Sequence, residues 1–113
     1  MSELRQVSKE QFNEEVLNSE VPVIIDFTTD GCGPCELLVP ILKDIDEKLG
    51  DQVKIIQHNV EFDDLVNEGN EHIKTYDVMA FPTIVIVKGG KPVDSILGIY
   101  DPEEIERRVR KIL

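Results

Sequence analysis

The strongest constraint on the fold comes from residues 21–27, an apolar and mostly β-branched run whose only charged member is Asp26. Such a run is typical of a central strand covered on both faces, because a strand with one wet face alternates apolar and polar side chains. Further on, apolar residues recur at helical spacing: Leu37, Leu38, Ile41, Leu42, Ile45 and Leu49. This spacing predicts a long helix from near Cys32 to Gly50, kinked at Pro40. A buried strand followed by a long helix predicts an α/β fold.

The same kinds of pattern continue along the chain. We expect strands at residues 4–7, 53–56 (continuing to 60), 83–87 and 93–97. We expect one helix after a capping box at residues 8–11 and another after the acidic N-cap Asp101. Residues 61–75 predict a weak helix. Residues 88–91 (Lys-Gly-Gly-Lys) predict a tight hairpin. Crossover helices imply parallel strands and the hairpin adds an antiparallel pair, so we predict a mixed central β-sheet with helices on both faces.

Length and charge narrow the class of protein. The chain has 113 residues, enough for one core, so we expect residues 1–113 to form a single domain. Its 23 acidic and 12 basic residues give a net charge of −11, which disfavours binding to nucleic acid and to anionic membranes. The sequence contains no apolar run of membrane-spanning length and no signal pattern at its start. We therefore expect a cytoplasmic protein with neither nucleic acid nor membrane as a partner.

The chain has two cysteines, Cys32 and Cys35. Two thiols make a poor framework for a secreted scaffold, and a C-x-x-C beside strand and helix patterns indicates redox chemistry or metal binding. At a helix start, the free N–H groups and the helix dipole would stabilise a thiolate at Cys32. Cys35, one turn further on, should be less exposed, and Gly33 and Pro34 would form the tight turn between them.

This arrangement predicts a dithiol exchange reaction. Cys32 would attack a substrate disulfide, and Cys35 would then attack Cys32 and release the reduced substrate. Asp26 is the natural proton carrier, because it ends an apolar strand that should run beneath the helix start. Burial would raise its pKa towards a useful range. A buried acid that only makes a local hydrogen bond is the alternative interpretation.

Several short motifs extend over nearly the whole chain. They are V-I-I-D-F at residues 23–27, C-G-P-C at 32–35, P-I-L at 40–42, V-M-A-F-P-T at 78–83, and glycines at 90 and 98. C-x-x-C alone is a weak signal, but C-G-P-C with Asp six residues before it and Pro five after it is specific. Together these motifs resemble the thioredoxin family.

The resemblance implies a substrate groove beside the cysteine pair. Ala80, Phe81 and Pro82 would pack there, with a cis bond before Pro82, and the backbone preceding that proline would pair with an extended substrate chain. The groove would be completed by Gly33, Pro34 and Gly98. The resemblance also implies protein disulfide substrates, a reductase of the NADPH-dependent flavoprotein type, a monomer, and no tightly bound cofactor beyond the Cys32–Cys35 disulfide itself.

Four departures from the family pattern concern the surroundings of the cysteines. Gly31 stands where the family usually has Trp, and it is either a plain turn residue or a substrate-binding position that widens the entrance to Cys32. Glu36 replaces a residue that is often basic, which should raise the pKa of Cys32. Gln57 replaces the usual Lys near the buried Asp, which should raise the pKa of that acid. Residues 62–73 are several residues longer than usual.

Other interpretations of the same residues remain open. The cysteines could form a static disulfide, or bind zinc together with His58 and His72, although these gaps match no zinc-finger spacing. The histidines could equally be an ordinary strand residue and a surface helix residue. Residues 61–71 could be a docking surface or a solvated helix face. The whole chain could instead be a binding module on the same fold, or an oxidase or isomerase.

Overall fold

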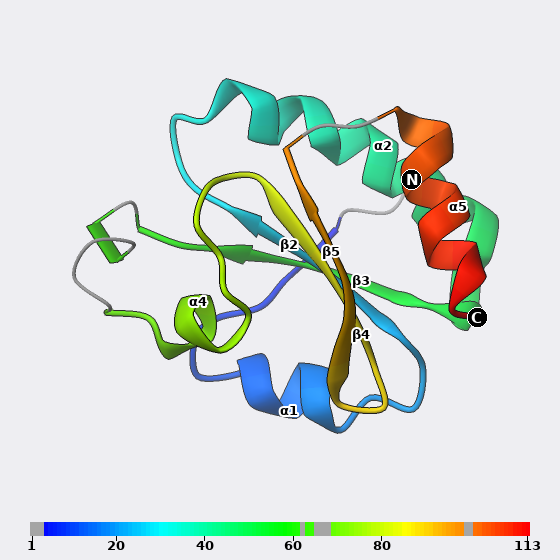
Figure 1. Ribbon diagram of the computed structural model, residues 1–113, viewed down its shortest axis with the longest axis horizontal. Helices are drawn as coiled ribbons and strands as arrows, with labels where there is room; N and C mark the ends of the chain where they lie inside the picture. Colours follow the sequence, from blue (N-terminus) through cyan, green and yellow to red (C-terminus); the bar gives the residue numbers. More distant parts are fainter. Residues whose placement is uncertain (1–3, 62, 65–68, 99–100) are drawn as a thin grey trace.

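The computed structural model describes residues 4–61, 63, 64, 69–98 and 101–113, and its elements follow the predicted order (Figure 1). The strands are β1 (Arg5–Gln6), β2 (Val23–Thr28), β3 (Lys54–Asn59), β4 (Thr83–Lys88) and β5 (Lys91–Leu97). The helices are α1 (Phe12–Leu17), α2 (Gly33–Leu49), α4 (Glu71–Thr75) and α5 (Pro102–Lys111), with a 3-10 turn η1 (Gly50–Gln52) after α2. The weak helix expected over 61–75 is present at its end as α4, while residues 62 and 65–68 lie outside the described residues.

The sheet is mixed, as predicted. Its strand order is β1-β3-β2-β4-β5, with β2 at the centre. β2 and β3 are parallel, as are β1 and β3, whereas β4 runs antiparallel to both β2 and β5. The apolar run that contains Asp26 is therefore the central strand, and its alternate residues enter cores on opposite faces of the sheet, which explains why it carries no polar alternation.

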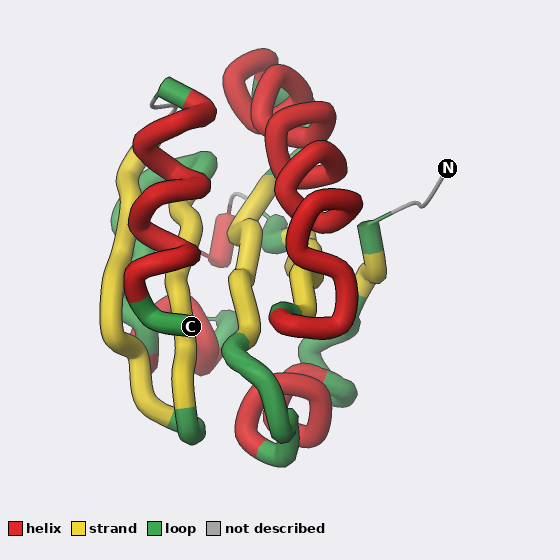
Figure 2. Tube along the Cα trace, turned by 90° about the vertical axis from the view of Figure 1, so that its right-hand side faces the viewer, coloured by secondary structure: helices red, strands yellow, loops and turns green. Residues whose placement is uncertain are grey.

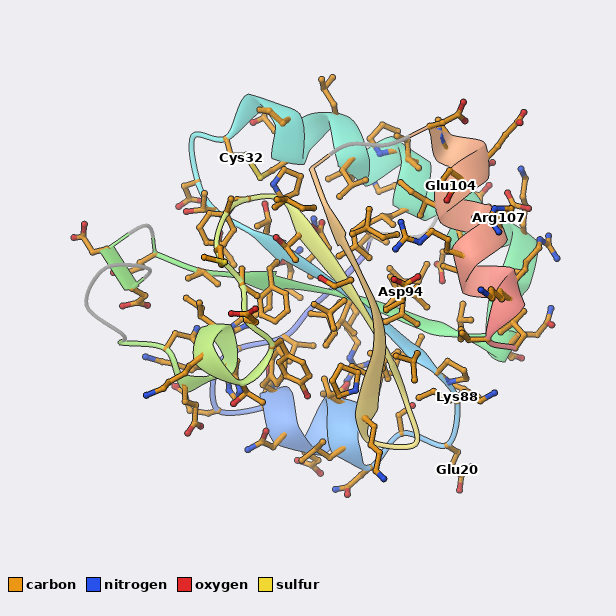
Figure 3. The ribbon with its side chains drawn as sticks, in the orientation of Figure 1. Glu20, Cys32, Lys88, Asp94, Glu104 and Arg107 are labelled. Atoms are coloured by element: carbon orange, nitrogen blue, oxygen red, sulfur yellow. A yellow bond between two sulfur atoms is a disulfide. The ribbon has the colours of Figure 1, made fainter. Side chains whose placement is uncertain are left out.

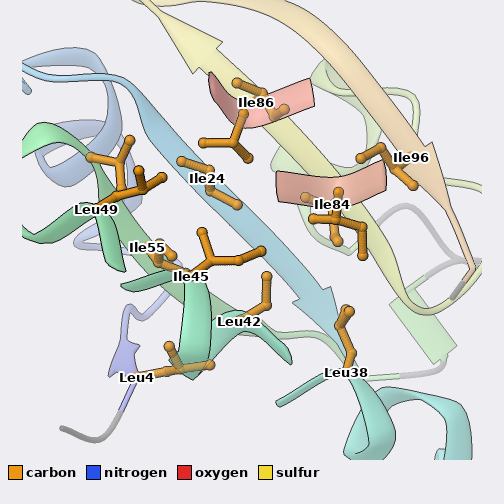
Figure 4. Close-up of a cluster of buried hydrophobic side chains, with 13 residues drawn as sticks. Leu4, Ile24, Leu38, Leu42, Ile45, Leu49, Ile55, Ile84, Ile86 and Ile96 are labelled. Carbon is orange, nitrogen blue, oxygen red and sulfur yellow. The ribbon is translucent and has the colours of Figure 1, made fainter. Parts of the chain in front are cut away.

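Helices cover both faces of this sheet. In Figure 1, α2 and α5 lie on one side of the strands and α1 and α4 on the other. Figure 2 shows α2 and α5 side by side along their face. Beneath these two helices, strand residues such as Ile24 and Ile84 share a hydrophobic core with Leu42 of α2 (Figure 4). Ile105 of α5 belongs to the same core. The opposite core contains Phe27 together with Phe12 and Val16 of α1 and Ile73 of α4.

Local signals in the sequence account for several element boundaries. Ser8 and Gln11 form the expected capping box before α1: the Gln11 N–H donates to Ser8 Oγ and the Ser8 N–H to Gln11 Oε1, each at 3.2 Å. Asp101 caps α5 by accepting from the Glu103 N–H at 2.8 Å. Gly89 and Gly90 both have positive φ, 61° and 78°, as a two-residue hairpin turn between β4 and β5 requires.

The alternation of side chains along β2 decides which of them face α2. Alternate residues of a strand point to opposite faces, so Asp26 lies on the same face as Ile24, which belongs to the core under α2 and α5. Ile25 and Phe27 belong to the other core. Among the described helices, none is both long and apolar enough to cross a membrane.

Candidate active site

The two cysteines form a disulfide at the start of α2 (Figure 3). Cys32 is the N-cap residue, and its Sγ accepts a hydrogen bond from the Cys35 N–H at 3.2 Å. Their Cα atoms are 5.3 Å apart, within the range that a disulfide requires. Cys35 is only 2% exposed, while Cys32 is half-buried. This confirms that Cys32 is the more accessible sulfur.

The chain entering α2 shows why these residue types occur at this turn. Gly31 has φ of +75°, a conformation that residues with a side chain rarely adopt. Pro34 lies in the first turn of the helix, where its missing N–H costs nothing. Cys32 Sγ therefore occupies the position of a capping acceptor, so in the reduced protein the same N–H group and the helix dipole would favour its thiolate.

Asp26 is fully buried, at 0% exposure. Gln57 Nε2 donates to Asp26 Oδ2 at 2.9 Å, and Asp26 Oδ1 has no hydrogen-bond partner among the described residues. Burial raises the pKa of Asp26 from 3.8 to about 6, and the Gln57 hydrogen bond opposes that rise. The predicted effect of burial on the Asp26 pKa is thus confirmed. Gln57 gives this carboxyl group a hydrogen bond but no compensating charge.

A third polar residue, Gln6, joins this pair and was not anticipated from the sequence. Gln6 Nε2 donates to Gln57 Oε1. Gln6 pairs with Gln57 between β1 and β3, and Asp26 pairs with Gln57 between β2 and β3. The edge strand was expected, but only the register of the sheet brings Gln6 beside Gln57.

The peptide bond between Phe81 and Pro82 is cis, as expected. Pro82 is buried, and its carbonyl accepts from the Gly98 N–H at 2.8 Å. Thr83 Oγ1 donates to the Ala80 carbonyl at 2.7 Å, which holds the turn before the proline. These contacts join the segment before β4 to the end of β5.

A pocket of about 490 Å³ brings the cysteine turn and the proline turn together. It is lined by Thr29, Asp30, Gly31, Cys32, Met79, Ala80 and Phe81. Three candidate groove residues, Gly31, Ala80 and Phe81, thus share one cavity with Cys32. Met79 is an addition to that set; at 77% exposure it is an apolar side chain with little cover. Gly33 and Pro34 are exposed at the start of α2 and do not line this pocket.

Comparison with known proteins agrees with this geometry, since residues 3–111 match the family model Thioredoxin. The chain belongs to the thioredoxin family. It is 33% identical to a thioredoxin of Synechocystis sp. (strain ATCC 27184 / PCC 6803 / Kazusa) over 113 residues, all of both chains. It is 35% identical to a thioredoxin of Rickettsia typhi (strain ATCC VR-144 / Wilmington), over 83% of this chain and 84% of that protein. Membership and the Cys32–Cys35 pair make the chain a thiol–disulfide oxidoreductase that reduces protein disulfides, with no tightly bound cofactor expected.

Compared with the usual thioredoxin pattern, the surroundings of the cysteines are acidic. Asp30 lines the pocket beside Cys32, and both Asp30 and Glu36 line a second cavity of about 290 Å³ that reaches Cys35. Neither cavity has a Lys or Arg among its lining residues. Asn59 Nδ2 donates to Asp30 Oδ1 at 3.3 Å.

The histidines take no part in this thioredoxin site. His58 Nδ1 donates to the Val7 carbonyl at 2.8 Å, and its Nε2 accepts from Asn70 Nδ2 at 2.9 Å. His72 is buried and stacks on Phe12 with ring centroids 3.9 Å apart, so the expectation of a surface helix residue is wrong. The short α4 turns this side chain into the core against α1. Within the described ranges, no three His, Cys, Asp or Glu side chains are grouped to hold a metal ion.

Proposed function

We propose that Cys32 is the nucleophile, Cys35 the resolving thiol and Asp26 the proton carrier of protein disulfide reduction. The observation that carries this proposal is the Cys32–Cys35 disulfide at the N-cap of α2, with Cys32 the more exposed cysteine. A thiolate at this position benefits from the helix N-terminus, and a nucleophile must reach its substrate.

The reaction proceeds in two exchanges. The Cys32 thiolate attacks one sulfur of the substrate disulfide, forming a mixed disulfide and releasing the other substrate sulfur as a thiolate, which takes a proton from water. Cys35 then passes its proton to the Asp26 carboxylate and attacks Cys32 Sγ. The second substrate sulfur leaves as a thiolate and takes up a proton. The protein ends with the Cys32–Cys35 disulfide, and the substrate has gained two electrons and two protons.

The raised pKa of Asp26 supports its role. With a pKa of about 6, the carboxyl group exists in both ionisation states near neutral pH. A group of this kind is able to accept the proton of Cys35 and to return it to solvent. Its burial on the α2 side of the sheet is consistent with accepting a proton from Cys35, in the first turn of that helix.

Substrate chains would bind along the cysteine and proline turns. In this proposal the groove residues are Gly31, Gly33, Pro34, Ala80, Phe81, Pro82 and Gly98. Exposed apolar side chains support a protein-binding surface here: Leu37 on α2 is 66% exposed, and Met79 adjoins the pocket next to Cys32. In this proposal the backbone before the cis Pro82 pairs with an extended substrate chain.

The wider setting belongs to the same proposal. Residues 1–113 would act as one monomeric domain in the cytoplasm, where thiols are kept reduced. A thioredoxin reductase, of the NADPH-dependent flavoprotein type, would return electrons to the Cys32–Cys35 disulfide. The acidic surface supports partners other than nucleic acid or membrane.

The test is dithiothreitol-driven reduction of insulin disulfides. We expect the intact protein to accelerate insulin precipitation, and Cys32→Ser to abolish the acceleration. Cys35→Ser should lose turnover and accumulate a mixed disulfide with the substrate, since only the resolving step is removed. Asp51→Asn, an exposed carboxylate remote in the chain from the motif, serves as the matched surface control. Equal rates with and without Cys32 would overturn the proposal.

A further inference from the structure

Three polar side chains form a row across adjacent strands on the α2 side of the sheet. Gln6 of β1 pairs with Gln57 of β3, which pairs with Asp26 of β2. Directly paired residues project from the same face of a sheet. The proposed mechanism uses only the last member of this row, so the role of the other two needs a separate explanation.

The hydrogen bonds in the row run in one direction. Gln6 Nε2 donates to Gln57 Oε1, and Gln57 Nε2 donates to Asp26 Oδ2 at 2.9 Å. A glutamine amide has one end that only accepts and one end that only donates. With its oxygen engaged by Gln6, the Gln57 amide presents its donor end to the carboxylate. The reversed amide would place an oxygen against that carboxylate and would stabilise only the protonated acid.

We propose that Gln6 is a positioning residue for disulfide exchange: it holds the Gln57 amide with its donor end on Asp26, so that the buried carboxylate is stabilised in the state that accepts a proton. This inference rests on the proposed function in one respect, the role of Asp26 as proton carrier. The orientation of the amide itself does not depend on that role.

The described surroundings of the row offer Asp26 no cation, so the Gln57 amide is the group that opposes the effect of burial on this carboxyl. On β4 the residue paired with Asp26 is the apolar Ile84. Glu36 and Cys35 of α2 and Asp30 of the preceding loop line the cavity that also contains Gln6 and Gln57. These charged neighbours are acids, and no Lys or Arg lines that cavity. Among the described residues, the side-chain donor to Asp26 is Gln57. Gln57 and Cys35 line the same cavity, which has a volume of about 290 Å³.

The decisive experiment reverses the amide. In Gln6→Glu, the new carboxylate can only accept, so it should bind Gln57 Nε2 and turn Oε1 towards Asp26. We expect the pKa of Asp26, followed by carboxyl carbon NMR in the oxidised protein, to rise by about one unit, a tenfold change in its ionisation constant. Gln6→Glu combined with Gln57→Leu measures the effect of the added charge alone, because no amide is left to turn. In that background the rise of the Asp26 pKa should be only a small fraction of the rise in the single variant. Equal rises in both backgrounds would overturn the inference.

Gln6→Lys is the matched variant, because lysine retains a donor for Gln57 Oε1 at the same exposed position of the edge strand. It should leave the Asp26 pKa unchanged or lower it, and a rise like that of Gln6→Glu would also overturn the inference. The pH profile of insulin reduction separates the two proposals. If the Asp26 pKa moves as expected while the profile stays fixed, the positioning of the amide is supported and the proton-carrier role of Asp26 fails.

Discussion

Replacing Asp26 with Asn should stabilise the folded protein at neutral and alkaline pH. The carboxyl group is fully buried, and burial raises its pKa from 3.8 to about 6. As pH rises from about 4 to about 6, the unfolded chain therefore loses this proton before the folded protein does. The free energy of unfolding falls across that window because of Asp26, and the loss is complete above it. Asn has the same shape, accepts the Gln57 hydrogen bond and carries no charge to desolvate.

The size of the effect follows from the shift. A rise of about two pKa units corresponds to about 3 kcal/mol between the two protonation states. Domains of this size are stable by about 5–15 kcal/mol. The destabilisation that the buried Asp26 charge causes at pH 8 is therefore large compared with the total stability. Well below pH 3.8 Asp26 is neutral in both states, and near pH 4 only a small part of the charge penalty has appeared, so the substitution should change stability little there.

The assay is urea denaturation of the oxidised proteins at about pH 4 and about pH 8. The difference between Asp26→Asn and the parent protein isolates this group from other titrations. We expect the variant to be more stable by up to about 3 kcal/mol at the higher pH only. Asp51→Asn, which removes an exposed carboxylate, should show no comparable gain. A gain of the same size at both pH values, or a loss at pH 8, would refute the reasoning.

Three further predictions concern single charges. Gln57→Lys should lower the pKa of Asp26, because a cation stabilises the adjacent carboxylate; carboxyl carbon NMR measures it. Glu36→Lys should lower the pKa of the Cys32 thiol and speed its alkylation below that pKa, since an acid in the first helical turn disfavours a thiolate. Burial lowers the pKa of His58 below 6.5, so the unfolded state binds this proton first and stability should fall as pH drops below about 6.5.

Each of these has a result that would contradict it. An unchanged carboxyl titration in Gln57→Lys would mean that the lysine does not reach Asp26. For the Cys32 thiol, the ultraviolet absorbance of the thiolate should appear at lower pH in Glu36→Lys than in the parent protein. Glu47→Lys, a substitution near the far end of the same helix, should not change that pH. Equal shifts in the two variants would point to net charge alone. For His58, a His58→Gln variant with the same acid-dependent loss of stability as the parent would assign that loss to other groups.

Much of the fold could be predicted because its signals are local. The apolar run of residues 21–27 and the helical spacing up to Leu49 depend only on the period of each element, and the paired glycines at 89 and 90 favour a tight turn. The position of Cys32 at the helix start is equally local, because the helical pattern begins just after it. The raised pKa of Asp26 could also be predicted from the sequence, because an acid in a strand covered on both faces is shielded from water.

The partners of these residues depended on the tertiary structure. Gln6 meets Gln57 only because β1 pairs with β3 in one particular register, and a shift of one residue would turn its side chain to the other face. Met79 adjoins the Cys32 pocket because the turn before the cis proline folds back on the start of α2. His72 was misassigned because a five-residue helix has too few residues to reveal which face is buried. The sequence by itself determined the elements and the reactive pair, whereas strand register and loop packing, which join residues far apart in the chain, decided what surrounds that pair.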